Sequence, residues 1–305
     1  MDIIHDKDAD VSVLNGKTVA VIGYGAQGRA QALCMRDSGV NVIIGIRPGK
    51  SWDAAVQDGF RVMSVEEAAK EGDIVHLLLP DEKHGEVYKN QIAPAMKAGK
   101  TLCCSHGFAY VFKTIVPPAD VDVIMVAPKG PGTEVRRVFE EGFGCPGLIA
   151  VFQNPSGKAR DVALAIAKAE GLTRGGVLEC TMAQETYEDL FGEQNVLCGG
   201  LVDLMKYGFE TLIEAGYPAE MAYFECVHEA KLIVDLIYNG GIQRMNSVIS
   251  NTAEFGEYYN GPQILGPEVK AKMKESLKRI ESGEFARVWL EEAAKGAPNL
   301  LAKRA

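Results

Sequence analysis

One segment constrains the fold more than any other: Gly23-Tyr24-Gly25-Ala26-Gln27-Gly28. It directly follows an apolar run with the composition of a buried strand and leads into a helical pattern over Ala26–Ser38. In that context the G-x-G-x-x-G spacing predicts a dinucleotide-binding βαβ unit. Gly23 permits the tight turn, Gly25 lets a pyrophosphate approach the backbone amides at the helix N-terminus, and Gly28 lets the helix pack closely on the strand.

Short apolar runs alternate with helical patterns over the first part of the chain, which predicts a doubly wound, mostly parallel sheet of the Rossmann type in an α/β fold. The expected strands are Thr18–Gly23, Asn41–Ile46, Asp73–Leu79, Thr101–Ser105, Val121–Ala127, Leu148–Phe152 and Val177–Cys180. The expected helices between them are Ala26–Ser38, Ser64–Glu71, Lys83–Lys97 and Ser156–Glu170.

The strand pattern ends near Met182, and long helical patterns follow. They cover Gln184–Ala215, Pro218–Tyr238, Gly266–Ser282 and Glu284–Lys295, with breaks expected at Gly216/Pro218, Gly240/Gly241 and Gly261/Pro262. We therefore expect two domains, a dinucleotide-binding domain over residues 1–182 and an all-helical domain over residues 183–305.

Composition excludes several function classes. The 305 residues are 47% hydrophobic and 24% charged, the balance of a soluble globular protein with a large core. A net charge of -9 argues against nucleic-acid binding, and no apolar segment is long enough to cross a bilayer. The N-terminus lacks a signal-peptide core, and the seven cysteines have no C-x-x-C spacing. We expect a cytoplasmic protein with reduced thiols.

The end of the second strand usually determines which dinucleotide is bound. The sequence there reads Gly-Ile-Arg47-Pro-Gly-Lys50-Ser51-Trp-Asp53. Arg47, Lys50 and Ser51 can provide charge and hydrogen bonds to a 2′-phosphate, which favours NADP(H). Asp53 can repel that phosphate and accept a hydrogen bond from an unmodified ribose, so NAD(H) remains an alternative.

Polar residues follow three further strands at the edge where open α/β sheets bind ligands. The first group is Asp81, Glu82, Lys83 and His84, where a cofactor contact and a simple helix start are both reasonable. Ser105-His106-Gly-Phe follows the next strand, and Lys129-Gly-Pro-Gly132 the one after it. His106 and Lys129 are the catalytic candidates, whereas His76, inside an apolar strand, is interpreted as a core histidine.

Two pairs of carboxylates, Asp189/Glu193 and Glu225/Glu229, are spaced four residues apart in apolar helical patterns. Each pair shares one helix face, and we expect that face to be buried. Because unpaired buried carboxylates are costly, four converging oxygen ligands predict a hard divalent cation. Buried ion pairs with Lys231 or Arg244 are the alternative. Glu210 and Glu214 have the same spacing on a polar stripe and are interpreted as solvated surface.

Together these motifs closely resemble the short class of ketol-acid reductoisomerase. They are Gly-Tyr-Gly-Ala-Gln-Gly, Leu-Leu-Pro-Asp-Glu, Ser-His-Gly-Phe, Ala-Pro-Lys-Gly-Pro-Gly, Glu-Asp-Leu-Phe-Gly-Glu-Gln and Ser250-Asn-Thr-Ala-Glu, in that order. The resemblance covers essentially the whole chain. It implies that the acetohydroxy acids 2-acetolactate and 2-aceto-2-hydroxybutyrate are substrates, and that alkyl migration precedes reduction by NAD(P)H. The products are 2,3-dihydroxy-3-methyl acids of branched-chain amino-acid biosynthesis.

The resemblance also implies roles for individual residues. Two Mg²⁺ ions would be held by Asp189, Glu193, Glu225 and Glu229, and Glu229 serves either as a ligand or as the acid/base. His106 and Lys129 would serve the active site, Ser250 would contact substrate, and Gly132 would lie near the nicotinamide. A homodimer, alone or in a larger assembly, would share its sites, with Glu225, Glu229 and Ser250 coming from the partner chain. Thr133 stands where the family usually has histidine, so no role is inferred there.

Two other functions remain open from the sequence. A β-hydroxyacid or 6-phosphogluconate-type dehydrogenase would combine the same fold with a lysine-centred site and no obligatory metal. A non-catalytic NAD(P)-sensing protein would keep the fold and lose the acids or His106, all of which are present here.

Overall fold

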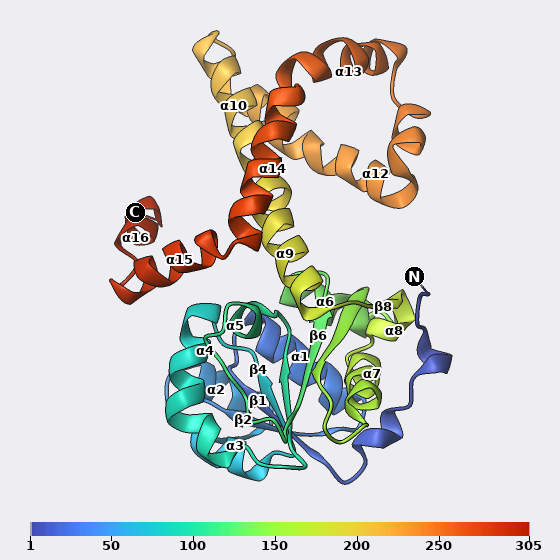
Figure 1. Cartoon of the computed structure of the whole chain (residues 1–305). Helices are drawn as coiled ribbons and strands as arrows, with labels where there is room; N and C mark the ends of the chain where they lie inside the picture. The colour runs from blue at the N-terminus through green and yellow to red at the C-terminus, as the bar shows by residue number, and fades with distance from the viewer. Residues whose placement is uncertain (1, 305) are drawn as a thin grey trace. The chain divides into compact units, whose positions relative to one another are not determined.

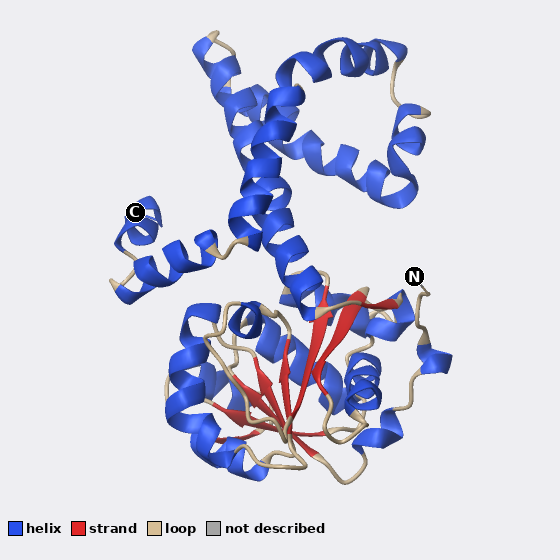
Figure 2. Ribbon diagram, viewed as in Figure 1, coloured by secondary structure: helices blue, strands red, loops and turns tan. Residues whose placement is uncertain are grey.

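The computed structural model describes residues 2–304, which divide into two compact units. The first contains the chain up to Thr186 together with the residues from Ala286 onward, and the second contains Tyr187–Phe285. Figure 2 shows that the strands gather in the first unit and that the second is helical. No helix in the described part of the chain is long and apolar enough to span a membrane.

The first unit is built on one eight-stranded sheet with the order β3-β2-β1-β4-β5-β6-β7-β8. Figure 1 labels β1, β2, β4, β6 and β8 of this sheet. All neighbouring strands are parallel except β6 and β7, which run antiparallel. The strands are β1 (Thr18–Ile22), β2 (Asn41–Gly45), β3 (Arg61–Met63), β4 (Ile74–Leu77), β5 (Thr101–Cys104), β6 (Asp122–Pro128), β7 (Gly147–Gln153) and β8 (Val177–Glu179).

Helices cover both faces of this sheet, and the two faces form separate hydrophobic clusters. Successive residues of β1 alternate between them, with Val19 and Val21 in one cluster and Ala20 and Ile22 in the other. Both faces are covered, so most strand residues are apolar, and the buried His76 of β4 is an exception. The helices of this region are α1 (Ala26–Asp37), α2 (Lys50–Gln57), α3 (Val65–Glu71), α4 (Asp81–Val87), α5 (Phe108–Val111), α6 (Gly132–Glu140), α7 (Ala159–Ala169) and α8 (Leu172–Gly175).

The chain passes from the first unit to the second within α9 (Met182–Gly192), and a π-helical turn, Glu193–Leu197, follows. Another π-helical turn, Phe224–His228, joins α11 to α12. The remaining helices are α10 (Gly200–Glu214), α11 (Ala219–Tyr223), α12 (Glu229–Asn246), α13 (Asn251–Ile264), α14 (Pro267–Glu281), α15 (Glu284–Ala294) and α16 (Pro298–Arg304). The last two are assigned to the first unit from Ala286 onward.

The sequence predicted the fold class and seven of the strands correctly, with small differences in their ends. It missed β3, which has only three residues, and did not include the helices α2, α5, α6 and α8. The expected break at Gly261/Pro262 was wrong, because both residues lie inside α13. The break at Gly240/Gly241 was partly right. The helix continues to Asn246, but Gly241 has a φ of 76° and kinks it.

His76 lies in the middle of this sheet, on β4, with none of its surface exposed. Its Nε2 lies 3.2 Å from the Ser105 hydroxyl, and its Nδ1 has no hydrogen-bond partner. Burial lowers the pKa of His76 from 6.5 to about 3, because the charged ring would lose its hydration. The interpretation as a core histidine is therefore confirmed, and the ring is neutral at pH 7.

This burial predicts a pH-dependent stability. An unfolded histidine binds its proton near pH ~6.5, whereas folded His76 does so only near pH 3. Between these values only the unfolded state binds the proton, so the free energy of unfolding falls by about 1.4 kcal/mol for each unit of acidification. Urea unfolding of His76→Gln between pH 6.5 and 4.5 is expected to show a slope smaller by that amount. The exposed His5→Gln is the control, and equal slopes for wild type and His76→Gln would contradict the assignment.

Candidate active site

Four loops meet at one edge of the first unit's sheet. They follow β1, β4, β5 and β6, which are neighbours and run parallel, so their carboxyl ends point the same way. These loops carry the glycine motif, the segment after Leu79, the Ser-His-Gly-Phe segment and the Lys-Gly-Pro-Gly segment. The structure thus brings the predicted cofactor and catalytic loops of this unit to a common edge.

The three glycines of the motif have the distinct environments that the sequence predicted. Gly23 has a φ of 109°, and a Cβ there would lie 2.4 Å from the Leu78 carbonyl oxygen. A Cβ on Gly28 would lie 2.4 Å from the Gly23 carbonyl oxygen, so the helix approaches the turn too closely for any side chain. Gly25 has nothing within 4 Å of a built Cβ. Its surroundings are open, as a position that faces a ligand requires.

The segment between β2 and α2 is exposed. Arg47, Lys50 and Ser51 all lie on the surface, and α2 begins at Lys50 after Gly49. Asp53 is also exposed and lies in the first turn of the same helix. An adenosine ribose or its phosphate could therefore bind these exposed side chains. Binding would not have to break any other side-chain contact that the structure records for them.

Tyr24 of the glycine motif points into the protein. Its ring packs edge-on against Phe60 at 5.8 Å between centroids, and its hydroxyl donates to Asp58 at 2.8 Å. Arg29 donates to both oxygens of the same carboxylate, which holds the pKa of Asp58 below its usual range. The side chain of Tyr24 therefore packs inside the protein and stabilises the motif. Only the backbone of Tyr24 is available to a cofactor.

His84 is likewise an internal residue. Its Nε2 donates to the Leu79 carbonyl at 2.8 Å, and only 3% of its surface is exposed. Burial is the main cause that lowers the pKa of His84. Asp81 and Glu82 form the first turn of α4, and Lys83 is exposed near Glu86. Of this predicted cofactor group, Lys83 is exposed, Asp81 and Glu82 are half-buried, and His84 holds the loop through its bond to Leu79.

The central residue of this edge is Glu185 of α9, which sequence reasoning missed. Its Oε1 accepts from Lys129 Nζ at 2.8 Å, and its Oε2 lies 3.2 Å from His106 Nδ1. The same Oε2 accepts a weaker bond from the Gly107 amide at 3.4 Å. The carboxylate therefore joins the two predicted catalytic residues. A signal was present in the sequence, because Glu185 precedes Asp189 by four residues and extends the acidic face by one turn.

Glu185 reaches this position because Gly107 has no side chain. A Cβ on Gly107 would lie 2.3 Å from the Thr186 hydroxyl and 2.4 Å from Met182 Cγ. The start of α9 can therefore pack directly on the loop that follows β5. Only a glycine allows this approach.

The electrostatics favour an ionised Glu185 although only 1% of its side chain is exposed. Burial alone would raise the pKa of Glu185, but hydrogen bonds and positive charge from His106 and Lys129 outweigh it. The net result is a pKa below the usual value. His106 and Lys129 remain partly exposed, at 16% and 32%, so each has one face toward the edge.

The four predicted metal ligands lie in two helical segments, and each segment contains a π-helical turn. Asp189 is on α9, four residues after Glu185, and Glu193 begins the turn Glu193–Leu197. Glu225 lies within the turn Phe224–His228, and Glu229 follows it. π-Helical turns are rare and occur frequently at functional sites. No group of three or more described His, Cys, Asp or Glu residues close enough to share an ion includes Glu193, Glu225 or Glu229.

The expected burial of these acids was wrong for the single chain. Glu193, Glu225 and Glu229 are exposed, and only Asp189 is partly buried. Their apolar neighbours are exposed as well, including Leu197 at 63% and Leu232 at 49%. The sequence predicted an apolar face, but the chain does not cover it with its own residues. Glu210 of the comparison pair is exposed beside Lys206, as expected.

The remaining predicted residues occupy defined positions. Ser250 is the N-cap of α13, where its hydroxyl accepts from the Ala253 amide at 3.1 Å. Gly132 begins α6, and a Cβ there would lie 2.3 Å from the Ala26 carbonyl oxygen. Thr133 is exposed on the first turn of α6. The loop after β6 thus packs tightly against the first turn of α1.

Two family models match nearly the whole chain. Residues 13–176 match the model described as acetohydroxy acid isomeroreductase, NADPH-binding domain, and residues 182–305 match the ketol-acid reductoisomerase C-terminal domain.

Curated relatives and a solved structure agree with these matches. The chain is 88% identical to the ketol-acid reductoisomerase (NADP(+)) of Akkermansia muciniphila over 304 residues, which cover 100% of this chain and 93% of that protein. It is 64% identical to the ketol-acid reductoisomerase (NAD(+)) of the uncultured archaeon GZfos26G2, again covering 100% and 93%. A solved NADH-preferring ketol-acid reductoisomerase from an uncultured archaeon matches with a TM-score of 0.98 and 64% identity, covering 100% of this chain and 94% of that one.

The contrast between Gly25 and Gly28 predicts that two similar substitutions will have different effects. Gly28→Ala should lower the free energy of unfolding by about 1–3 kcal/mol through overpacking. Gly25→Ala should leave stability unchanged but weaken NADPH binding about tenfold or more, because its methyl group would stand between the backbone amides and the pyrophosphate. Urea unfolding and a fluorescence titration with NADPH measure the two effects. Equal loss of stability in both variants, or unchanged NADPH binding by Gly25→Ala, would contradict this division of roles.

Proposed function

We propose that His106, Lys129 and four helix carboxylates carry out the reaction of this chain, which belongs to the ketol-acid reductoisomerase family. The chain is of the short class and is an NAD(P)H-dependent enzyme that acts on an acetohydroxy acid in branched-chain amino-acid biosynthesis. A dehydrogenase without a metal and a non-catalytic sensor are not supported by this assignment. The observation that carries the residue-level proposal is the bridge from Glu185 to both His106 and Lys129.

We assign two Mg²⁺ ions to Asp189, Glu193, Glu225 and Glu229. Carboxylate oxygens are the ligands that Mg²⁺ prefers, and four of them offset the charge of two ions. The donor set fits, because the described residues give Glu193, Glu225 and Glu229 exposed carboxylates at two π-helical turns. When bound, the ions supply Lewis-acid polarisation of the ketone and hydroxyl oxygens of the substrate.

Lys129 and His106 orient the substrate for that chemistry, and Glu229 can accept a proton. The ionised Glu185 fixes the Lys129 ammonium and the His106 ring in one orientation toward the edge. Lys129 then presents a fixed positive charge to a substrate oxygen, and His106 orients a water or the substrate. Glu229 ligates a metal or accepts the proton of the tertiary hydroxyl before the alkyl group migrates. Ser250 contacts the substrate, and Gly132 lies near the nicotinamide end of the cofactor.

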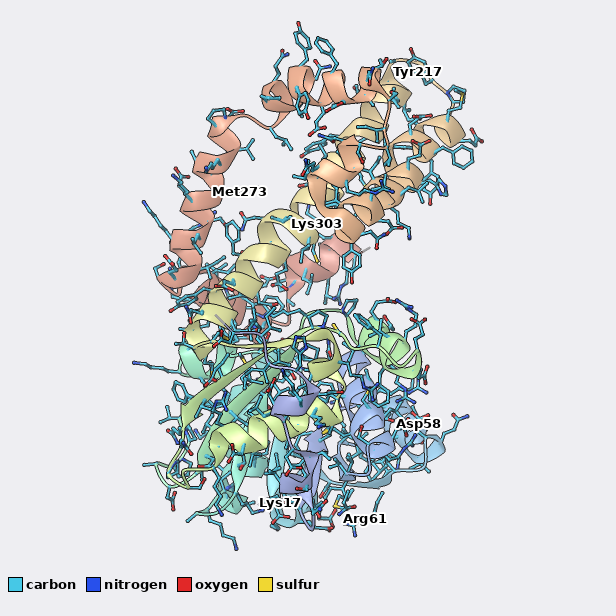
Figure 3. All side chains as sticks on the ribbon, turned by 90° about the vertical axis from the view of Figure 1, so that its right-hand side faces the viewer. Lys17, Asp58, Arg61, Tyr217, Met273 and Lys303 are labelled. Carbon is cyan, nitrogen blue, oxygen red and sulfur yellow. The ribbon has the colours of Figure 1, made fainter. Side chains whose placement is uncertain are left out.

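We propose that the enzyme is a homodimer, alone or in a larger assembly, with Glu225, Glu229 and Ser250 contributed by the partner chain. Of the 29 large apolar side chains exposed among the described residues, 22 belong to the second unit. Tyr238 is 78% exposed, and Tyr217, labelled in Figure 3 between α10 and α11, is 56% exposed. A monomer rarely leaves so much apolar surface in water, so a second copy of the chain is the occupant that we propose.

The coenzyme preference that we propose is NADPH. Arg47, Lys50 and Ser51 stand exposed together at the end of β2, where a 2′-phosphate would be held. The 88% identical relative carries the name of an NADP(+) enzyme, although the 64% identical ones are named for NAD(+) or NADH. We further propose that the chain divides into two domains at residue 182. We also propose that the enzyme is cytoplasmic.

Coenzyme oxidation with 2-acetolactate tests the metal and coenzyme assignments together. Turnover should require Mg²⁺, cease with EDTA, and show a lower KM for NADPH than for NADH. Glu225→Gln should lower kcat by about 100-fold or more, because one charged metal ligand is lost. Glu210→Gln, an exposed acid with the same spacing on α10, is the control and should remain fully active. Undiminished activity in EDTA or in Glu225→Gln would refute the metal assignment, and a lower KM for NADH would refute the coenzyme assignment.

Mixing two inactive variants tests the shared site. Asp189→Asn and Glu229→Gln should each be inactive as pure proteins. Coexpression should restore activity to about a quarter of wild type, because half of the dimers are mixed and each mixed dimer keeps one intact site. Coexpression of Asp189→Asn with Glu193→Gln is the control and should restore nothing, since both residues come from the same chain of each site. Equal recovery in both mixtures, or none in either, would contradict the proposed division between subunits.

A further inference from the structure

A chain of hydrogen bonds runs through the first unit beneath the catalytic edge. Gln27 Nε2 donates to the Gly130 carbonyl at 2.9 Å, and Gln31 Nε2 donates to Gln27 Oε1 at 3.0 Å. The Ser105 hydroxyl lies 3.1 Å from both ends of the Gln31 amide. His76 Nε2 lies 3.2 Å from the same hydroxyl. We call these four side chains, His76, Ser105, Gln31 and Gln27, the polar relay.

The chemistry of its two ends determines the direction of the relay. Gly130 presents a carbonyl oxygen, which only accepts, so Gln27 must donate there. At the other end, His76 Nδ1 is buried without a partner. A buried N–H without a partner is rarer than an unsatisfied acceptor, so we assign the proton to Nε2. His76 then donates to Ser105, Ser105 to Gln31, Gln31 to Gln27 and Gln27 to Gly130.

Two members of the relay cannot touch a ligand. Gln31 and His76 have none of their surface exposed. Burying polar side chains of this kind costs folding free energy unless their hydrogen bonds are made. The four side chains of the relay therefore either keep these hydrogen bonds together or lose their arrangement together. His76 stays neutral over the physiological pH range, because burial lowers its pKa to about 3. The hydrogen-bond donors are therefore fixed.

The relay connects three of the four loops at the catalytic edge. Gln27 belongs to the glycine motif after β1, and Ser105 immediately precedes His106 after β5. Gly130 immediately follows Lys129 after β6. His106 and Lys129 are also the two residues that hold Glu185. The loops after β5 and β6 are therefore joined twice, by Glu185 at the edge and by the relay beneath it, and the relay alone joins the glycine motif to them.

We propose that the polar relay is a positioning device that fixes the Lys129–Gly132 loop relative to the dinucleotide loop and to His106. The four side chains are positioning residues, since they act through Gly130 and Ser105 on residues that face the substrate. The close contact between Gly132 and the Ala26 carbonyl supports this role, because it leaves the loop no space to shift toward α1. The Gln27–Gly130 bond prevents it from moving away. The proposal rests on the assignment of Lys129 and His106 to the active site.

Gln31→Leu tests the relay at its buried centre. The leucine fills a similar volume but leaves Ser105 and Gln27 without their partner. Amide hydrogen exchange should become about tenfold faster in peptides that contain residues 128–134, because the Gly130 carbonyl loses its fixed donor. With 2-acetolactate, NADPH and Mg²⁺, kcat should fall about tenfold, while the KM for 2-acetolactate changes less than about twofold.

Gln153→Leu is the matched control. Gln153 is a half-buried glutamine of β7 whose Nε2 donates to the Pro118 and Val121 carbonyls, each at 3.0 Å. It makes the same kind of bond in the same sheet, outside the relay. It should lose comparable stability without changing the exchange of residues 128–134 or the kcat.

A second pair of variants keeps the test decisive if Gln31→Leu does not fold. Ser105→Ala removes the hydroxyl that connects His76 to Gln31, and Ser105→Thr retains it. Ser105→Ala should show the faster exchange and the lower kcat, and Ser105→Thr should recover most of both. Unchanged exchange in the variant that breaks the relay, or faster exchange with an unchanged kcat, would overturn the proposal. A wild-type enzyme without Mg²⁺-dependent turnover would refute the metal mechanism instead, and the exchange comparison would still report on the relay.

Discussion

The arrangement of His106 and Lys129 at the sheet edge depends on one buried carboxylate remaining charged. Glu185 is almost fully enclosed, and an isolated carboxylate in that position would take up a proton. It stays ionised because Lys129 and His106 surround it, and these two residues in turn are held in place by its charge. The charge of Glu185 therefore depends on its two partners, and the positions of both partners depend on Glu185. The arrangement of His106, Lys129 and Glu185 therefore exists without a ligand, which spares a substrate the cost of ordering these three groups.

The backbone around Glu185 depends on close approaches rather than on large side chains. Gly107 lets α9 lie against the loop after β5, and Gly132 lets the loop after β6 lie against α1. Gly28 does the same for α1 and the turn before it. Three glycines thus bring three loops within hydrogen-bond distance of one another, and the polar side chains between them then have only one favourable arrangement. Close packing at the glycines places the loops, and hydrogen bonds between polar side chains then fix them. A few short motifs are therefore enough to determine the structure of this edge.

Much of this could be predicted from the sequence, and the failures have physical reasons. The strand periods and the glycine motif placed His106 and Lys129 at one edge correctly, because parallel strands end together. Glu185 was missed because its partners are distant in sequence and only the fold brings them near. The apolar faces beside Glu193 and Glu225 were predicted to be buried, yet periodicity identifies an apolar face without identifying what covers it. Pro262 was predicted to break the helix, but α13 continues to Ile264, since a proline removes only its own N–H donor from the helix.

The exposed segment between β2 and α2 has an evolutionary consequence. Arg47, Lys50, Ser51 and Asp53 stand on the surface, outside the polar relay and the contacts of Glu185. If these four side chains hold the coenzyme as we propose, changes among them would alter which coenzyme is preferred while His106, Lys129 and Glu185 keep their positions. A lineage can therefore adapt to the balance of reduced coenzymes in its cell by a few surface mutations, without rebuilding the chemistry. The relatives at 88% and 64% identity are named for NADP(+) and for NAD(+), respectively.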